Sequence, residues 1–192
     1  MNKRIITISH EFGSGGRTIG KMVAEKLSIP CYDAELIEEI EKKSGFAKDY
    51  IKEAGEYTSG SFFSTVFANR SIASTPEGKL WKLQCQIIRE LAKKESCVIV
   101  GRCADYILRD RTDCLKVFIH ADMKFRAARI VEVYGERDET PEQRLRNKDK
   151  RRAAYYQFYT DMEWGNLHNY HLVLDSGELG IEQCVDMICQ LY

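Results

Sequence analysis

The stretch EFGSGGRTIG, residues 11–20, decides the fold of this chain. It contains four glycines, and it joins two segments whose apolar residues follow different periods. Before it, residues 5–8 form a mainly apolar run that predicts a buried strand. After it, residues 19–27 carry apolar side chains at helical spacing. A strand, a glycine-rich turn and a helix in this order are typical of a loop that holds a phosphate group.

The standard phosphate loop reads G-x-x-x-x-G-K-[ST], and this stretch departs from it at two positions. Glu11 replaces the first glycine and Arg17 replaces the lysine, whereas Gly16 and Thr18 match. Glycines in the turn allow backbone N–H groups to approach an anion closely. We therefore expect a phosphate site, with Thr18 as the candidate Mg²⁺ ligand, although a turn that binds nothing is the alternative. The expected phosphate-binding residues are Gly13, Ser14, Gly15, Gly16, Arg17 and Thr18.

Strand and helix signals alternate along most of the 192 residues, which predicts a single α/β domain over residues 1–192. The strands read as continuous apolar runs, which indicates a five-stranded parallel sheet with helices on both faces, a three-layer sandwich. The expected strands are residues 3–9, 29–33, 96–102, 114–121 and 170–176. The expected helices are residues 17–27, 34–43, a segment beginning at Trp81, residues 122–135 and a segment after residue 176.

Two segments, residues 46–79 and 136–169, interrupt this alternation. We interpret the first, with its serines, glycines and scattered aromatic rings, as a helical insert. The second contains RLRNKDKRR, residues 144–152, with six basic residues and one acid. Such a run is either a solvated helix face or a cluster that binds phosphate. Within it, Asp149 either orients an arginine or reduces the repulsion between the cations.

The composition excludes several classes of protein. Lys plus Arg and Asp plus Glu both number 29, so we expect no nucleic-acid partner, because nucleic-acid-binding domains are usually basic. No apolar run approaches the roughly 20 residues that cross a bilayer, so we expect no membrane partner. Seven scattered cysteines without a C-x-x-C pair favour reduced thiols in a cytoplasmic protein over disulfides or zinc.

The glycine loop, the segment GRCADYIL at residues 101–108 and the segment RRAAYYQFYTDMEWG at residues 151–165 together resemble the cytidylate kinase-like family. That family is a nucleoside monophosphate kinase branch of the P-loop NTPases. The resemblance implies a phosphotransferase that uses ATP and Mg²⁺ and acts on a nucleoside monophosphate, CMP or dCMP first. It also implies that residues 136–169 form a lid over the donor, and that residues 46–79 form an insert on the acceptor side.

The resemblance also assigns roles to individual residues. Arg102 matches the arginine that holds the acceptor's phosphate, and Cys103 stands where true cytidylate kinases carry aspartate. Asp105 is the candidate substitute for that aspartate, and Asp33 is implied near the acceptor or Mg²⁺. The expected catalytic cations are Arg17, Arg102, Arg151 and Arg152, and the expected acceptor-binding residues are Asp33, Arg102 and Asp105.

Two other functions stay open at this level. Cys103 weakens the nucleotide assignment, which leaves a kinase for a different small acceptor. Glu11 and Arg17 depart from the standard loop, which leaves a nucleotide-binding or sensing module without turnover. The expected partners are small-molecule nucleotide substrates. A homo-oligomer is compatible with the sequence but is not predicted by it.

Overall fold

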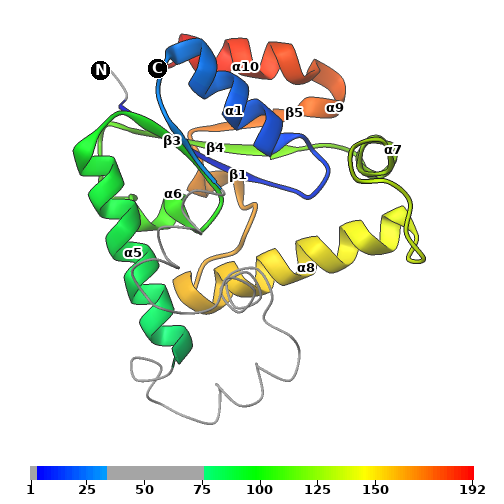
Figure 1. The fold of residues 1–192 in the computed structure, drawn as a ribbon, viewed down its shortest axis with the longest axis horizontal. Helices are drawn as coiled ribbons and strands as arrows, with labels where there is room; N and C mark the ends of the chain where they lie inside the picture. The colour runs from blue at the N-terminus through cyan, green and yellow to red at the C-terminus, as the bar shows by residue number, and fades with distance from the viewer. Residues whose placement is uncertain (1–3, 34–75) are drawn as a thin grey trace.

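A five-stranded parallel sheet forms the centre of the protein (Figure 1). The computed structural model describes residues 4–33 and 76–192. The strand order is β2-β3-β1-β4-β5, and every pairing is parallel, so the carboxyl ends of the strands lie at one edge. This confirms the predicted α/β fold. The strands are β1 Ile5–His10, β2 Cys31–Tyr32, β3 Cys97–Val100, β4 Cys114–His120 and β5 Leu172–Asp175.

Strand β1 lies in the middle of the sheet, between β3 and β4, and all six of its residues are buried. Successive side chains of a strand point to opposite faces. Ile6 and Ile8 accordingly join the apolar cluster on one face, and Ile5 joins the cluster on the other. A strand that is covered on both faces needs apolar residues at nearly every position, which is why residues 5–8 predict it.

Helices cover both faces of the sheet, as the three-layer prediction requires (Figure 1). Helices α1, Gly16–Leu27, and α10, Ile181–Gln190, pack on one face and contact each other. Helices α5, Pro76–Lys94, and α6, Ala104–Ile107, pack on the opposite face. Within the described residues, the sheet is therefore buried between two apolar clusters, which leaves the ends of its strands accessible.

Helices α7 and α8 connect β4 to the last part of the chain. Helix α7, Met123–Tyr134, begins after Asp122, whose carboxylate accepts hydrogen bonds from two backbone N–H groups, and ends at Gly135; both ends were predicted. Helix α8, Pro141–Thr160, occupies most of the predicted lid segment and lies on the same side of the sheet as α5 (Figure 1). The short elements η2, Leu167–Asn169, and α9, Ser176–Leu179, flank β5.

The structure corrects one predicted boundary. Helix α5 begins at Pro76 and not at Trp81, so the end of the expected insert belongs to this helix. Proline is favoured in the first turn of a helix, where its missing N–H has no intrahelical partner to lose. The predicted helix at residues 34–43 and the insert at residues 46–75 lie outside the described residues. No helix in the described ranges is long and apolar enough to cross a membrane.

Candidate active site

A cavity of about 710 Å³ opens at the carboxyl edge of the sheet. This edge is where parallel α/β proteins bind ligands. Among the described residues that line the cavity, eight are arginine or lysine and two are acidic, although the whole chain has no net charge. Such a concentration of positive charge favours a polyanionic ligand. The eight cations are Arg17, Arg102, Arg129, Arg137, Arg144, Lys148, Arg151 and Arg152.

The glycine loop forms the cavity wall beside α1. Gly13 and Gly15 have φ angles of 84° and 83°, in the left-handed region that favours glycine. A Cβ on Gly13 would also lie 2.9 Å from Ile130 Cγ2, closer than real contacts allow. Helix α1 begins at Gly16, and no side chain in the described part of the chain caps its N-terminus. The amide hydrogens of its first turn therefore face an anion site that the backbone itself creates.

Ser14, which was expected to contact the donor phosphates, supports the loop from behind. Its side chain is fully buried, and its Oγ donates to the carbonyl oxygens of Glu11 at 2.9 Å and Ile119 at 3.2 Å. Its own carbonyl oxygen accepts a hydrogen bond of 2.6 Å from Ser176 Oγ. Because these buried bonds already occupy the hydroxyl, Ser14 contributes the shape of the loop and its side chain is turned away from the cavity.

Arg17 and Asp33 both line the cavity, and the structure joins them as an ion pair through Arg17 Nε. Asp33 directly follows β2, so the pair connects the start of α1 to the end of a neighbouring strand. The sequence placed Arg17 with the donor and Asp33 with the acceptor or the metal. A carboxylate in contact with a guanidinium offsets much of its charge, so the pairing reduces the charge that Arg17 alone offers to a phosphate.

Thr18 lies at the cavity beside the loop, and its Oγ1 accepts a hydrogen bond of 2.9 Å from Arg129 Nη2. Within the described ranges, no cluster of three or more His, Cys, Asp or Glu residues is arranged to hold a metal ion. Mg²⁺ in kinases usually needs only one or two protein oxygens, with substrate phosphates and water completing its shell. The hydroxyl of Thr18 and the carboxylate of Asp33 fit that limited requirement.

Arg102 is the second residue after β3 and has a φ angle of 59°, which turns the chain sharply at the cavity. Gln84 Nε2 donates to the Arg102 carbonyl oxygen at 3.1 Å, so the turn is held from α5. Arg102 Nη1 is buried and has no hydrogen-bond partner among the described residues. An unpaired buried guanidinium nitrogen is unfavourable. This atom is therefore the clearest indication, among the described residues, that the cavity can bind an anion.

Asp105, the expected substitute for the family's aspartate, does not line the cavity. It is 2% exposed, accepts hydrogen bonds from Ser9 Oγ at 3.1 Å and Tyr156 OH at 2.6 Å, and burial raises its pKa. It therefore joins β1 to α8 behind the wall. Cys103 does line the cavity, and burial raises the pKa of its thiol well above the usual value, so this position presents a neutral group.

One face of α8 is turned toward the cavity. Arg144, Lys148, Arg151 and Arg152 all line it, at the spacing that places residues on one side of a helix. Arg152 Nη1 donates to the carbonyl oxygen of His10 at 2.8 Å and so ties α8 to the end of β1. The structure therefore brings the predicted Arg151 and Arg152 into the same cavity as the glycine loop and Arg102.

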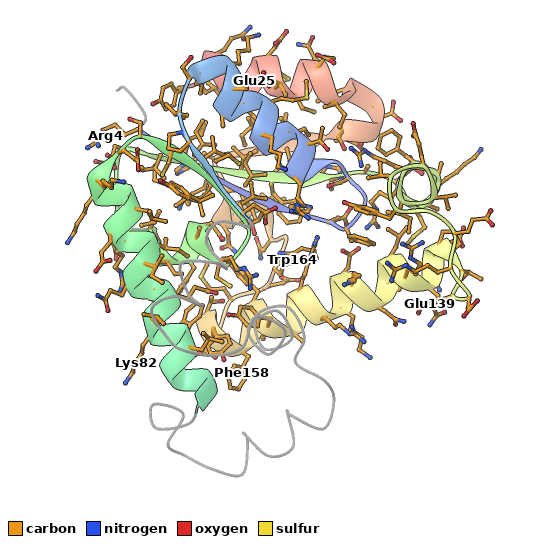
Figure 2. All side chains as sticks on the ribbon, viewed as in Figure 1. Arg4, Glu25, Lys82, Glu139, Phe158 and Trp164 are labelled. Atoms are coloured by element: carbon orange, nitrogen blue, oxygen red, sulfur yellow. The ribbon has the colours of Figure 1, made fainter. Side chains whose placement is uncertain are left out.

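Aromatic side chains form the cavity wall near the end of α8. Tyr155 and Tyr156 are buried, and both line the cavity together with Trp164. The Trp164 ring packs edge-on against Phe118 of β4, with the ring centroids 5.5 Å apart. Figure 2 shows Trp164 after α8, between this helix and the sheet, and Glu139 beside the beginning of α8. The lining thus changes from cationic to aromatic along α8.

The comparisons with known proteins agree with this geometry. The sequence profile described as the cytidylate kinase-like family matches residues 5–178. The chain belongs to the cytidylate kinase-like family. It is 31% identical over 190 residues to a protein named cytidylate kinase from Archaeoglobus fulgidus, covering 95% of this chain and 91% of the relative. The predicted family is confirmed, and the chain is a kinase-like phosphotransferase.

Solved structures show the same fold. A crystal structure of an uncharacterized protein from Eubacterium ventriosum has a TM-score of 0.76 and 31% sequence identity, with 98% of this chain and 97% of that chain covered. Shikimate kinase from Acinetobacter baumannii, in complex with shikimate, has a TM-score of 0.56 at 18% identity, with 98% and 92% covered. The second likeness extends to the fold alone, because its identity is low.

Glu11 occupies the position of the first glycine of the standard loop in this member of the cytidylate kinase-like family. Its side chain is turned away from the cavity, and its Oε2 accepts a hydrogen bond of 3.2 Å from the Ala121 N–H and lies 3.4 Å from Arg126 Nε. Burial raises the pKa of Glu11, and the adjacent Arg126 opposes that effect. The departure anchors the loop to the segment after β4, and Glu11 is not among the residues that line the cavity.

Arg126 was not predicted as a site residue. It is 5% exposed, its Nη1 lies 2.5 Å from Asp149 Oδ2, and it also donates to the Phe12 carbonyl oxygen at 3.3 Å. Asp149 Oδ1 in turn accepts a 2.8 Å hydrogen bond from the Phe12 N–H. Asp149 therefore orients an arginine, but one from α7 and not from its own basic run. In the sequence, the arginines at positions 126 and 129, about one helical turn apart, could have indicated a cationic face on this helix.

His10, the last residue of β1, was also not predicted. Its Nδ1 lies 2.9 Å from the Glu11 carbonyl oxygen and 3.4 Å from Arg152 Nη1. Burial, and then the charge of Arg152, lower the pKa of His10 to about 3, so the ring is neutral at neutral pH. A Cβ on Gly16 would collide with His10 Cβ and Cγ. Position 16 therefore has no room for any side chain.

Proposed function

We propose that this protein is a kinase that uses ATP and Mg²⁺ to phosphorylate a nucleoside monophosphate, with CMP or dCMP as the first candidates. The observation that carries the proposal is one cavity in which the glycine loop faces Arg102, whose buried Nη1 has no partner among the described residues. The loop suits a donor triphosphate, and Arg102 suits a second phosphate. The choice of acceptor is supported by the similar proteins, which are named cytidylate kinases.

The donor end of the site works through backbone groups. The amide hydrogens of Gly15, Gly16 and Arg17 at the start of α1 would bind the oxygens of the β- and γ-phosphates. The positive end of the helix dipole adds to this attraction. Thr18 and Asp33 would hold Mg²⁺, which neutralises phosphate charge when it is bound. These contacts would direct the γ-phosphate toward the cavity.

The transfer step needs alignment and positive charge more than covalent help from the protein. An oxygen of the acceptor's phosphate attacks the γ-phosphorus, and the bond from that phosphorus to the bridging oxygen breaks. The electron pair leaves with ADP, and the acceptor becomes a diphosphate. Arg151 and Arg152 would neutralise the oxygens of the group in transit, while Arg102 holds the attacking phosphate.

The test is a panel of acceptors with the purified chain, ATP and Mg²⁺, in which ADP formation is measured. We expect ADP to appear with CMP or dCMP and to require the acceptor. ADP formed only with UMP, AMP or a sugar phosphate would show a kinase for another small acceptor, an outcome that Cys103 favours. The Arg102→Ala variant is the matched control, because it should lose acceptor-dependent ADP formation and still bind ATP.

A nucleotide-binding module without turnover is the second candidate. It is favoured by one observation, the ion pair between Arg17 and Asp33, because this pair removes charge from the position of the missing lysine. Calorimetry with ATP, together with the acceptor panel, separates the two functions. Binding of ATP without ADP formation from any acceptor would exclude the kinase. We place the protein in the cytoplasm with small nucleotides as its partners, as its nucleotide substrates would require.

A further inference from the structure

The glycine loop has no lysine to hold the donor phosphates. Neither position 16 nor Arg17 is well suited to supply the cation that the lysine would provide. Position 16 has no room for a side chain, because His10 fills the space where a Cβ would lie. Arg17 is engaged with the carboxylate of Asp33. A triphosphate bound at the start of α1 would therefore need a cation from another part of the chain.

Arg129 of α7 lies against this part of the loop. Its Nε and Cζ are 3.4 Å and 3.6 Å from the place that a Cβ on Gly15 would take. Its Nη2 donates to Thr18 Oγ1 at 2.9 Å. The guanidinium thus spans the first residues of α1, lines the cavity, and is half-buried. This is where the oxygens of a bound phosphate would meet the first-turn amides.

The rest of α7 holds Arg129 at this position. One turn earlier, the buried Arg126 binds both Asp149 and the Phe12 carbonyl oxygen, which fixes α7 relative to the loop. On the next residue, Ile130 is fully buried against the space beside Gly13. A side chain whose helix is fastened on both sides loses little conformational freedom on binding, which makes it effective as a ligand contact.

We propose that Arg129 is the donor-phosphate cation of this kinase, in the role that a lysine has in the standard loop. The inference rests on the proposed function and names a residue of the same site. A guanidinium offers several N–H donors in one plane, so Arg129 can keep its bond to Thr18 and bind two phosphate oxygens. Arg17 is then left to position Asp33 beside the metal and the acceptor.

Calorimetric titrations of wild type, Arg129→Ala and Arg129→Lys with ATP and with inorganic tripolyphosphate test the proposal. Arg129→Ala should weaken both ligands by about 10-fold to 100-fold, the effect of one lost charge-assisted contact. Arg129→Lys should restore part of that loss, because it keeps the charge. Lys124→Ala is the matched control, since it removes an exposed cation from the same helix and should bind as wild type does.

Three results would overturn the proposal. Equal affinity of wild type and Arg129→Ala for both ligands would show that Arg129 only ties α7 to Thr18. A loss with ATP but not with tripolyphosphate would place Arg129 at the nucleoside and not at the phosphates. Absence of binding by wild type would overturn the proposed function as well. Thermal unfolding verifies that each variant folds, and Arg129→Gln, which keeps size and a donor, replaces the alanine variant if that one does not.

Discussion

The two halves of the cavity are built in different ways. The loop half, residues 11–18, takes its shape from left-handed glycines and from buried hydrogen bonds such as those of Ser14. The α8 half presents long cationic side chains, and distant pairs such as Asp149 with Arg126 hold that helix in place. Backbone amides can bind a phosphate regardless of the group that carries it, whereas side chains would select and align a second ligand. We therefore expect the loop half to be disrupted by substitutions that add bulk, and the α8 half by substitutions that change charge.

The largest effect is expected from Gly13→Ala, which tests the loop half. Alanine would have to keep a φ near 84° with its Cβ 2.9 Å from Ile130 Cγ2 and 3.0 Å from the Arg126 carbonyl oxygen. Backbone strain and overpacking together should lower the free energy of unfolding by about 4 kcal/mol, measured by urea denaturation. Gly101→Ala is the control, because its φ is 73° but nothing lies within 4 Å of a Cβ. An equal loss in both variants would contradict the steric explanation.

Asp149→Asn tests how the α8 half is held. The change leaves Arg126, which is 5% exposed, with the more distant Glu11 as its carboxylate partner, while the amide can still accept from the Phe12 N–H. We expect a loss of about 3 kcal/mol in the free energy of unfolding, since removing the nearer carboxylate leaves the buried Arg126 only partly compensated. Asp186→Asn breaks the exposed pair with Lys26 and should cost far less, because solvent screens an ion pair at the surface. A loss as small as the control's would mean that α8 is held by other contacts.

Arg102→Ala tests the proposed acceptor contact, which lies between β3 and α6 and outside both halves. We expect KM for the acceptor to rise about 30-fold, equivalent to roughly 2 kcal/mol, with little change in Kd for ATP. The stability of the ligand-free protein should not fall, because the buried Nη1 has no partner among the described residues. Arg109→Ala, at an exposed arginine outside the cavity lining, is the control. A loss confined to ATP binding would assign Arg102 to the donor.

The smallest effect concerns His10, where the two halves meet. Its pKa falls to about 3 on folding, from an unfolded value near 6.5, so its contribution to stability is complete above pH 6.5 and is lost as the pH falls toward 3. At pH 5.5 the wild type should have lost about 1.4 kcal/mol more than His10→Gln, relative to pH 7.5. Urea denaturation at the two pH values measures this difference, with His168→Gln as the exposed control. Identical pH dependence in wild type and His10→Gln would show that His10 titrates normally.

Much of the fold could be predicted because its signals are local. The run at residues 5–8 indicates a doubly covered strand, and Asp122 and Gly135 mark both ends of α7. These features depend on neighbours within a few residues, so periodicity and capping reveal them. The start of α5 was harder to predict, because serines and glycines precede Pro76 and resemble a loop.

The site was only partly predictable, because its positioning contacts join distant residues. The Phe12 N–H and Asp149 are 137 positions apart, and Ser9 and Asp105 are 96 positions apart. Nothing near Asp105 in the sequence indicates that its carboxylate is buried behind the wall. Similarly, the periodicity of α7 identifies its apolar positions but says nothing about the contacts of Arg129. Its contact with Thr18 arises from the docking of α7.

The sequence by itself determined the sheet, the helices around it and a glycine turn able to bind phosphate, because backbone sterics and apolar periodicity act over a few residues. Only the tertiary structure decided which charged groups line the cavity and which ones stabilise its walls. That division depends on burial and on partners from other elements, since a carboxylate or guanidinium behaves as a ligand contact or as a support according to what surrounds it.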